Sequence, residues 1–498
     1  MSVLWEALNN ISTITMVLLF ISLAIALFYE MVNGFHDTAN AVAMIIYTNS
    51  MKASYSVIMA GIMNFFGVIL GGIGVAYVIV HLLPLDIMVS SNQTGTLVMI
   101  FALLIAALVW NFGTWYFGLP VSSSHSLIGS LVGVSIAFGM TNGFSFSQSV
   151  NWDVVYKILT ALAVAPLGGF IVAYISMKIS RIFVKNPKYY RTPSTTEDGK
   201  KKKPNFWMRT GIIATGAGVS FAHGSNDGQK GIGLVMIILI GILPTYYSLN
   251  MEAHQYKIMQ VRDSASNLAK FYKDNNETLT KLLDEKKVKS ALKVQSQIDE
   301  CNVNQVYNTT VEIATKLDGL KTYSELTPDD RWNVHNAVLC SDNFFEQVEK
   351  AYKSIDKDKS DYVSDQRKLL LPSTEYVPYW VIIAVALMIG IGTMIGYKRV
   401  VHTIGEKIGS KPINHMQGTI SQGMAMITIL LANFAHAPVS TTHIVSSSVA
   451  GTMVAEPDGT VQKKTINTIL LAWLFTLPVT AGMGALIYVG LSYITKIG

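Results

Sequence analysis

The sequence has few charged residues and very few cysteines. Only 14% of its 498 residues are Asp, Glu, Lys or Arg, whereas 50% are hydrophobic, and the mean hydropathy is +0.38. Soluble globular proteins carry about 25% charged residues. The two cysteines, Cys301 and Cys340, have no metal-ligand spacing around them, which argues against a thiol-based site. The sequence therefore predicts an all-α polytopic membrane protein.

The few charged residues are also unevenly distributed along the chain, and most of them lie in one block. Residues 251–371 hold 18 Lys and Arg and 20 Asp and Glu, which is more than half of all charged residues. We interpret this block as a soluble, mainly helical insertion in which Cys301 and Cys340 would form a disulfide if it is external. The net charge of +6 lies mainly in short loops, so it indicates membrane orientation and excludes nucleic-acid binding.

The N-terminus lacks a basic region and a small-residue cleavage site, so we expect the first apolar run to be a retained span. Apolar segments long enough to cross a bilayer fall into two sets of five in the same order. The first set lies near 12–48, 54–83, 94–117, 121–140 and 153–177, and the second near 210–245, 376–397, 416–434, 438–455 and 465–495.

The distribution of basic residues gives these segments a direction. The linker at 178–209 contains ten Lys and Arg, including Lys200 to Lys203, whereas the loops at 84–93 and 141–152 contain none. Basic loops stay in the cytoplasm, so both termini and the insertion are predicted to be external. Five crossings per half is an odd number, which predicts an inverted repeat of two five-segment halves with broken or re-entrant helices. If the two segments of about 35 residues are hairpins plus spans, the side of the insertion changes.

The predicted organisation follows from these boundaries. It comprises a first membrane repeat (1–177), a basic cytoplasmic linker (178–209), the start of a second repeat (210–250), the insertion (251–371, periplasmic) and the remainder of the second repeat (372–498).

A polar stretch interrupts the first segment of each half. Residues 30–43 read EMVNGFHDTANAVA, and residues 220–233, at an offset of 190, read SFAHGSNDGQKGIG. Asp37 then matches Asp227, and Asn40 matches Lys230. Ionisable residues at membrane depth are costly and mark a substrate or ion path. We expect Gly34 to be a point where the helix breaks; the competing interpretation is a pair of glycine-lined helix crossings.

A second element is also duplicated. Residues 118–126 read GLPVSSSHS, and residues 436–444, at an offset of 318, read HAPVSTTHI. Proline suits the first helical position, and hydroxyl side chains there lie beside backbone N–H groups that have no partner within the helix. Such a helix end is a ready anion site; the alternative is two well-capped helices whose hydroxyls satisfy only themselves.

These two elements together favour one ligand. Carboxylates repel an anion unless the anion donates a hydrogen bond, a cation lies between them, or a proton is taken up. Phosphate at neutral pH carries O–H groups, whereas sulfate does not, and a site that hydrogen-bonds such a group rejects the analogue by about 10⁴ or more. Phosphate with a co-transported cation satisfies both elements.

At these residues the sequence closely resembles the PiT family of inorganic phosphate transporters, and within it the low-affinity bacterial transporters. The resemblance is strongest at 28–43, 110–125, 207–241 and 438–452. It implies secondary import of phosphate through the bacterial inner membrane on an inverted-repeat fold. It also implies proton coupling and transport of a divalent metal-phosphate complex, whereas other branches use sodium. Lys230 stands where the family motif ends in Asn, which puts a sodium-ligand role there in doubt.

The expected partners are phosphate, protons or sodium, divalent metal ions, the bilayer and a second copy of the chain; no cofactor and no enzymatic activity are expected. Two other classes stay open, an anion channel and an intramembrane serine hydrolase. The predicted substrate-binding residues are Asp37, Asn40, Ser122, Ser123, Ser124, Asn226, Asp227, Gln229, Lys230, Ser440, Thr441 and Thr442. Coupling candidates are Glu30, His36, His125, His223 and His443, with a transported metal near Asp37 and Asp227. We assign Gly67 and Gly71 to helix packing.

Overall fold

The computed structural model describes residues 2–83, 93–119, 121–193, 203–282, 305–395, 408–409, 412–456 and 461–495. Helices account for most of this length. In the first half they are α1 (Ser2–Asn10), α2 (Thr13–Tyr47), α3 (Ala53–Leu70), α4 (Gly74–Val80), α6 (Gln93–Tyr116), α7 (Ser123–Thr141) and α8 (Trp152–Phe183), followed by η1 (Pro187–Tyr190). The second half opens with α9 (Phe206–Ile242) and α10 (Pro244–Tyr247) and closes with α16 (Tyr379–Ile395), α18 (His415–Phe434), α19 (Thr441–Ala455) and α20 (Lys463–Ile494).

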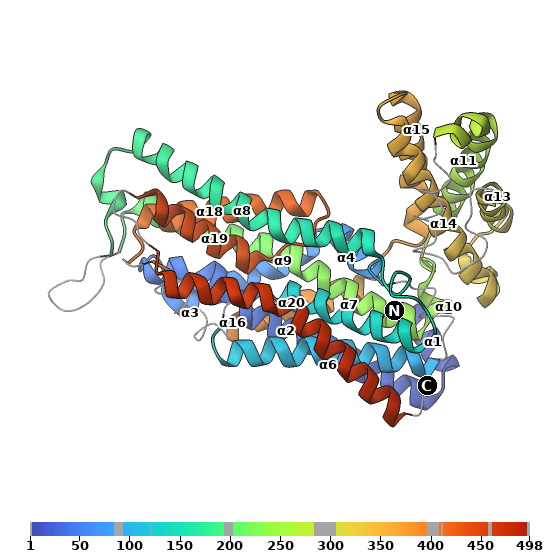
Figure 1. The fold of residues 1–498 in the computed structure, drawn as a ribbon, viewed down its shortest axis with the longest axis horizontal. Helices are drawn as coiled ribbons and strands as arrows, with labels where there is room; N and C mark the ends of the chain where they lie inside the picture. The colour runs from blue at the N-terminus through green and yellow to red at the C-terminus, as the bar shows by residue number, and fades with distance from the viewer. Residues whose placement is uncertain are drawn as a thin grey trace.

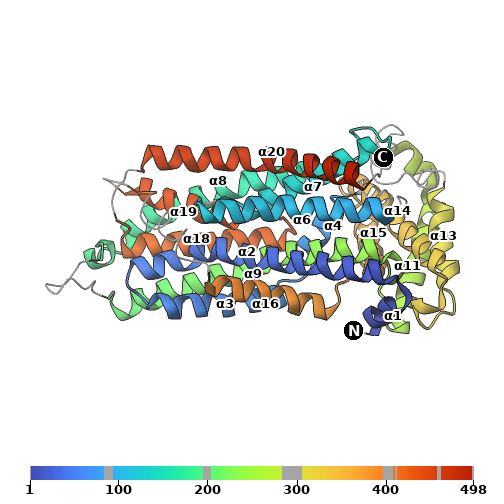
Figure 2. The same ribbon diagram turned by 90° about the horizontal axis from the view of Figure 1, so that it is seen from below.

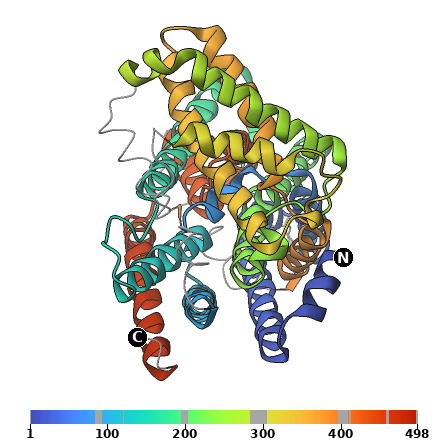
Figure 3. The same cartoon turned by 90° about the vertical axis from the view of Figure 1, so that its right-hand side faces the viewer.

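The long helices form an elongated bundle, and the described helices of the insertion lie across one end of it (Figures 1 and 3). Six helices in the described part of the chain are long and apolar enough to cross a membrane. Exposed apolar side chains on α8 and α20, such as Leu167 and Leu474, suit a surface that faces lipid. The all-helical membrane class predicted from composition is therefore confirmed.

The insertion is a separate helical unit with its own core. It contains α11 (Gln255–Leu282), α13 (Val306–Leu317), η2 (Tyr323–Glu325), α14 (Pro328–Tyr352), α15 (Lys357–Leu370) and η3 (Leu371–Ser373). Phe344 and Phe345 on α14 are fully buried in that core, and the largely buried Arg367 pairs with Asp342 and Glu349. Cys340 is disulfide-bonded, whereas Cys301 lies outside the described residues.

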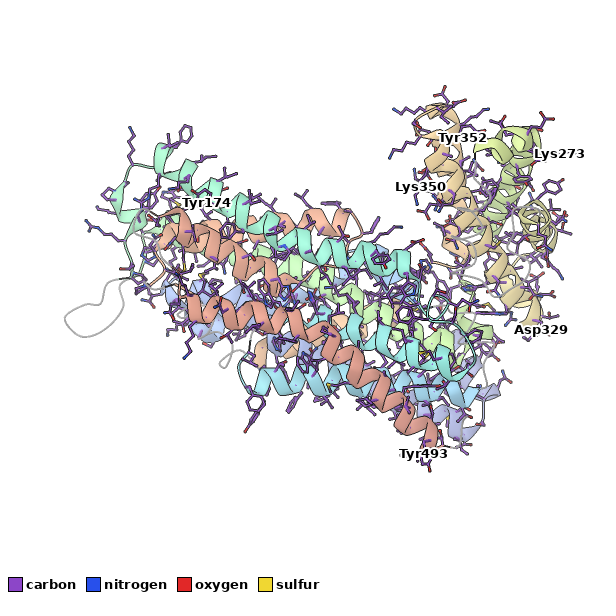
Figure 4. The ribbon with its side chains drawn as sticks, viewed as in Figure 1. Tyr174, Lys273, Asp329, Lys350, Tyr352 and Tyr493 are labelled. Atoms are coloured by element: carbon purple, nitrogen blue, oxygen red, sulfur yellow. The ribbon has the colours of Figure 1, made fainter. Side chains whose placement is uncertain are left out.

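Both chain ends lie at the end of the bundle that carries the insertion, as Figure 2 shows. Tyr493, close to the end of α20, lies toward this end, and Tyr174 on α8 lies toward the other (Figure 4). The described parts of the basic linker, η1 and the start of α9, lie at that other end. The polypeptide thus separates its basic linker from its termini and insertion by the length of the bundle.

The five segments of each half do not all cross the whole bundle, an arrangement that the expected broken or re-entrant helices allow. Helices α6 and α7 pack against each other as a hairpin, and α18 and α19 form a second one. Ser123 at the start of α7 contacts Asp37, and Thr441 at the start of α19 contacts Asp227. Both acids lie well inside α2 and α9, so neither hairpin crosses the whole bundle. The second predicted segment, near 54–83, is also interrupted, because α3 and α4 are separated at residues 71–73, where Gly72 has a φ of +83°.

Two close helix crossings, that of α2 with α16 and that of α3 with α9, position the polar stretches. A Cβ at Gly34 of α2 would lie 2.5 Å from the Ile389 carbonyl oxygen of α16. A Cβ at Gly67 of α3 would lie 2.2 Å from the Phe221 carbonyl oxygen of α9. The glycines therefore let backbones approach closely, as expected for Gly67 and Gly71. The prediction that Gly34 breaks its helix is wrong, because α2 runs without interruption from Thr13 to Tyr47. Gly34 instead allows two helices to cross closely, which was the competing interpretation.

Candidate substrate and ion site

The two polar stretches face each other across the middle of the bundle. Asp37 on α2 and Asp227 on α9 are 3% and 1% exposed, and both carboxylates contact the same imidazole. His223 Nε2 lies 3.1 Å from Asp37 Oδ2 and 3.1 Å from Asp227 Oδ2. Its Nδ1 lies 2.9 Å from Asn64 Oδ1 on α3. Both ring nitrogens therefore face oxygens, an arrangement that a doubly protonated imidazolium satisfies.

The two hairpin tips deliver hydroxyl groups to these carboxylates. Thr442 Oγ1 donates to Asp37 Oδ1 at 2.5 Å, and Thr441 Oγ1 donates to Asp227 Oδ2 at 3.1 Å. Ser123 Oγ lies 3.4 Å from Asp37 Oδ2. The first turns of α7 and α19 thus meet between α2 and α9. Since the N-terminal N–H groups of a helix carry partial positive charge, this junction favours a negative ligand.

Two of the predicted hydroxyl ligands serve a different purpose. Ser122 and Ser440 are the N-cap residues of α7 and α19, and their Oγ atoms accept from the N–H groups of His125 and His443 at 3.2 Å. Helix α19 begins at Thr441, so Pro438 precedes the helix and is not its first residue. Ser122 and Ser440 therefore accept hydrogen bonds from their own helices, as the alternative of two well-capped helices expects. The hydroxyls one and two residues later instead reach the carboxylates and their partners.

Lys230 closes the junction on the α9 side. Its Nζ forms an ion pair with Asp227 and donates to Ser124 Oγ at 2.5 Å and to the Val439 carbonyl oxygen at 2.6 Å. Asn40 occupies the matching place on α2 and donates to Asp37 Oδ1 at 2.9 Å and to Thr442 Oγ1 at 3.0 Å. With His223 and Lys230 as cations, the charges of the two carboxylates are balanced.

Two predicted ligands instead position the surrounding backbone. Asn226 Nδ2 donates to the Ala437 carbonyl, and its Oδ1 accepts from the Val439 N–H, so this amide fixes the turn before α19. Gln229 bonds the carbonyl of Gly71 and the N–H of Val75 and so satisfies the break between α3 and α4. Both side chains are used by the protein itself.

The coupling candidates other than His223 lie around this centre. The rings of His125 and His443 contact each other with centroids 4.5 Å apart, and His443 stacks on Trp473 at 3.8 Å. His36 Nε2 lies 3.4 Å from Thr114 Oγ1 on α6. Glu30 is fully buried; its Oε2 accepts from Asn33 Nδ2 at 3.4 Å, and its Oε1 makes no hydrogen bond. These four side chains do not join the hydrogen-bonded centre within the described residues.

Sequence reasoning missed two buried carboxamides that support the centre and the first hairpin. Asn64 Oδ1 accepts from His223 Nδ1 at 2.9 Å, and Asn64 Nδ2 donates to Thr393 Oγ1 on α16 at 2.7 Å. Asn111 on α6 accepts from Ser126 at 2.6 Å and so links the two arms of the first hairpin. The signal was present, because an isolated carboxamide inside an apolar segment obeys the same rule that identified Asp37.

A group of three ligands at the centre also suits a metal cation. Asp37, His223 and Asp227 each offer an atom within 4.8 Å of the others, and all three are buried. Two carboxylates and an imidazole are ligands that divalent transition metals accept. The centre therefore combines three side chains of a type that ligates cations with two helix N-termini that favour an anion.

Comparison with known proteins decides the family. A family model described as "Phosphate transporter family" matches residues 33–484. The chain belongs to the phosphate transporter family. The low-affinity inorganic phosphate transporter PitB of Escherichia coli K12 is 42% identical over 96% of this chain and 98% of its own. PitA of the same organism is 41% identical over the same shares.

The family assignment extends to more distant relatives and to the fold. A probable low-affinity inorganic phosphate transporter of Bacillus subtilis is 26% identical over 95% of this chain and 97% of its own. A solved structure titled "The sodium-dependent phosphate transporter" covers 96% of this chain and 100% of its own with a TM-score of 0.53 and 18% identity. At that identity the likeness shows the fold alone. The resemblance to the PiT family is confirmed, whereas the inverted duplication stays a prediction.

Proposed function

We propose that this protein is a secondary transporter that imports inorganic phosphate across the bacterial cytoplasmic membrane by proton symport. The observation that carries the proposal is the junction of the α7 and α19 N-termini with the buried pair Asp37 and Asp227. The relatives named above are called low-affinity inorganic phosphate transporters. A centre that combines anion-binding helix ends with paired carboxylates suits a ligand that both accepts and donates hydrogen bonds.

Phosphate meets this requirement. Its oxygens would accept from the N–H groups and hydroxyls at the starts of α7 and α19, and its O–H would donate to a carboxylate. The hydroxyls of Thr441 and Thr442 now donate to those carboxylates. A proton taken up on Asp37 or Asp227 would release the hydroxyl toward phosphate, because a protonated carboxyl is a weaker acceptor. Proton uptake and phosphate binding would thereby support each other.

A divalent cation would enter as part of the substrate. The trio of Asp37, His223 and Asp227 offers the ligands for it, and a metal between two carboxylates would screen them from phosphate. In that case His223 has to give up its proton, because a metal ligand must be a neutral imidazole. Transport of a metal-phosphate complex would therefore release one proton inside the site.

The remaining alternatives make different demands on the site. Sodium coupling requires an oxygen cage that is free of fixed cations, whereas Lys230 lies within the centre. A serine hydrolase requires an imidazole on a serine hydroxyl, whereas the His125 ring contacts His443 and its Nδ1 makes no hydrogen bond. An anion channel requires a continuous path, whereas the described hairpin tips meet where the Ser124 hydroxyl donates to the Val439 carbonyl oxygen at 3.0 Å.

The proposed orientation places the termini and the insertion outside the cytoplasm. It is supported by their common position at the end opposite the basic linker (Figure 1). We also propose that the chain is divided into two membrane repeats, a basic linker and a periplasmic insertion, with the boundaries given above. A homodimer stays a prediction.

Uptake of labelled phosphate into proteoliposomes tests the function. With an inward proton gradient, we expect saturable uptake that a protonophore abolishes and that sulfate does not compete. Adding magnesium should increase uptake if a metal-phosphate complex is carried. Uptake driven by a sodium gradient alone would contradict proton symport, and a current that rises linearly with voltage without saturating would indicate a channel.

A further inference from the structure

The most unusual group in the centre is the ammonium of Lys230. It is 2% exposed, and its contacts are the Asp227 carboxylate, Ser124 Oγ and the Val439 carbonyl oxygen. The three acceptors come from three separate elements: α9, the start of α7 and the turn before α19. An ammonium has three donors and no acceptor, so these three oxygens use all of its hydrogen-bonding capacity.

The duplicated sequence supplies an internal comparison. Asn40 corresponds to Lys230 at the offset of 190, and Thr442 corresponds to Ser124 at the offset of 318. Asn40 contacts Asp37 and Thr442, just as Lys230 contacts Asp227 and Ser124. The two halves thus make the same pair of contacts, with a neutral amide in one half and a fixed positive charge in the other.

The ligand set around Lys230 is one that a dissolved cation would also accept. A carboxylate, a hydroxyl and a backbone carbonyl are hard oxygen donors, the type that cations without soft-ligand preference bind. We propose that Lys230 is a tethered counter-cation that occupies, in the α9 half, the place where a mobile monovalent cation such as sodium would otherwise bind. This residue would therefore determine the coupling ion, an inference that rests on the proposed phosphate transport.

Charge balance explains why the tether matters. Removing the ammonium leaves two buried carboxylates opposed by one imidazolium. An unpaired charge in such surroundings is strongly destabilising, so the site would recruit a replacement cation from solution. The amide of Asn would leave room for that cation and add a carbonyl oxygen to its ligands, as Asn40 offers in the other half.

The experiment compares Lys230→Asn with the wild type in proteoliposomes, with sodium or choline as the only monovalent salt. Wild-type uptake should be equal in both salts. Uptake by Lys230→Asn should fall about tenfold or more in choline and recover with sodium, since the missing charge is worth at least that factor. Lys230→Met, which has neither charge nor an added oxygen ligand, should stay inactive in both. Lys157→Asn, at a lysine side chain that is 67% exposed, should behave as wild type.

A second measurement does not depend on transport. The melting temperature of purified Lys230→Asn should rise with sodium concentration in the absence of phosphate, whereas that of the wild type should not. The inference is overturned if Lys230→Asn gains neither sodium-dependent uptake nor sodium-dependent stability, or if the wild type is itself stabilised by sodium. A Lys230→Asn protein that fails to reach the membrane from a sodium-rich medium also counts against it, because sodium should replace the lost charge.

These outcomes are separable from failure of the proposed function. If the wild-type protein carries no phosphate, the function fails whatever the variants do. If the wild type is proton-driven and the variants show no response to sodium, only the assignment of Lys230 fails.

Discussion

The imidazole of His223 joins the carboxylates of Asp37 and Asp227, and its Nε2 is 3.1 Å from an oxygen of each. One side chain therefore links the two halves of the protein at the point where their duplicated sequences correspond. Its other ring nitrogen contacts Asn64, so the ring is fixed in the plane that reaches both acids. The charge of this one ring decides how strongly the two carboxylates repel an incoming anion.

Replacing His223 by Gln should abolish most phosphate uptake. The amide reaches a carboxylate but carries no charge, so two buried carboxylates would face each other with only Lys230 to balance them. We expect uptake to fall about tenfold or more, because each buried charge left unpaired costs several kcal/mol. The pH dependence of uptake between pH 5 and 8 should also differ from that of the wild type. A wild-type rate and profile in this variant would remove His223 from the mechanism, provided that the protein is present at wild-type amounts.

The two acids should fail in different ways. Asp37→Asn and Asp227→Asn should both lose uptake, since either carboxylate is expected to take the phosphate proton or the cation. Asp227 also pairs with Lys230, so its replacement leaves a buried ammonium without its carboxylate. That loss should destabilise the protein by about 3–5 kcal/mol, more than Asp37→Asn does, because in that variant His223 and Lys230 both keep Asp227 as a partner. Thermal unfolding in detergent measures the difference. Equal stability of the two variants would contradict the pairing, and normal transport by either would remove that residue from the site.

The meeting of these acids was predictable from the sequence because duplication constrains space. Two copies of one unit, each with an acidic stretch inside an apolar helix, can bury those acids most economically by facing them toward each other. The positions of Ser124 and Thr442 followed in the same way from the second duplicated element. The residues around Asp37 and Asp227 can therefore be predicted from the sequence, although their roles stay predictions.

Other features were not accessible by the same reasoning. Helices α6 and α7 are each long and apolar enough to cross a membrane, so length alone could not show that they form a hairpin. A glycine within a polar stretch predicts a helix break at Gly34. Its actual role, to let α2 pack closely on α16, depends on a backbone more than 350 residues away in the chain. The same holds for Asn226 and Gln229, whose partners are backbone groups of other elements.

The crossing of α3 with α9 should tolerate no side chain at Gly67. A Cβ there would lie 2.2 Å from the Phe221 carbonyl oxygen, so Gly67→Ala must separate the two helices. Overpacking of this kind costs about 1–3 kcal/mol, and it should also displace Asn64 from His223. Gly168→Ala on α8 is the control, because a Cβ there meets nothing within 4 Å. We expect a lower melting temperature and reduced uptake for Gly67→Ala only. Equal effects of the two substitutions would refute the close crossing.

Glu375, in the segment that leads from the insertion into α16, should make the stability of the protein depend on pH. Burial, with a smaller contribution from Asp342, raises the pKa of its carboxyl from 4.5 to about 7. Between pH 4.5 and 7, Glu375 therefore keeps its proton in the folded protein and has lost it in the unfolded chain. The stability of the protein should consequently decrease as pH rises through this range. The full difference is about 3 kcal/mol at neutral pH. The carboxyl contacts His81 at 3.7 Å, so this change would be felt where the insertion meets α4.

Thermal unfolding of the full chain in detergent between pH 4.5 and 8 tests this expectation. Glu375→Gln keeps the shape and removes the titration, so its stability should vary less with pH and exceed that of the wild type near pH 8. Glu6→Gln, at an exposed position on α1, should retain the wild-type slope. If Glu375→Gln and the wild type lose stability in parallel as pH rises, burial of Glu375 is not the cause, and the dependence has to come from another group. If stability instead increases with pH in the wild type alone, the carboxyl is ionised in the folded protein and the sign of the argument is wrong.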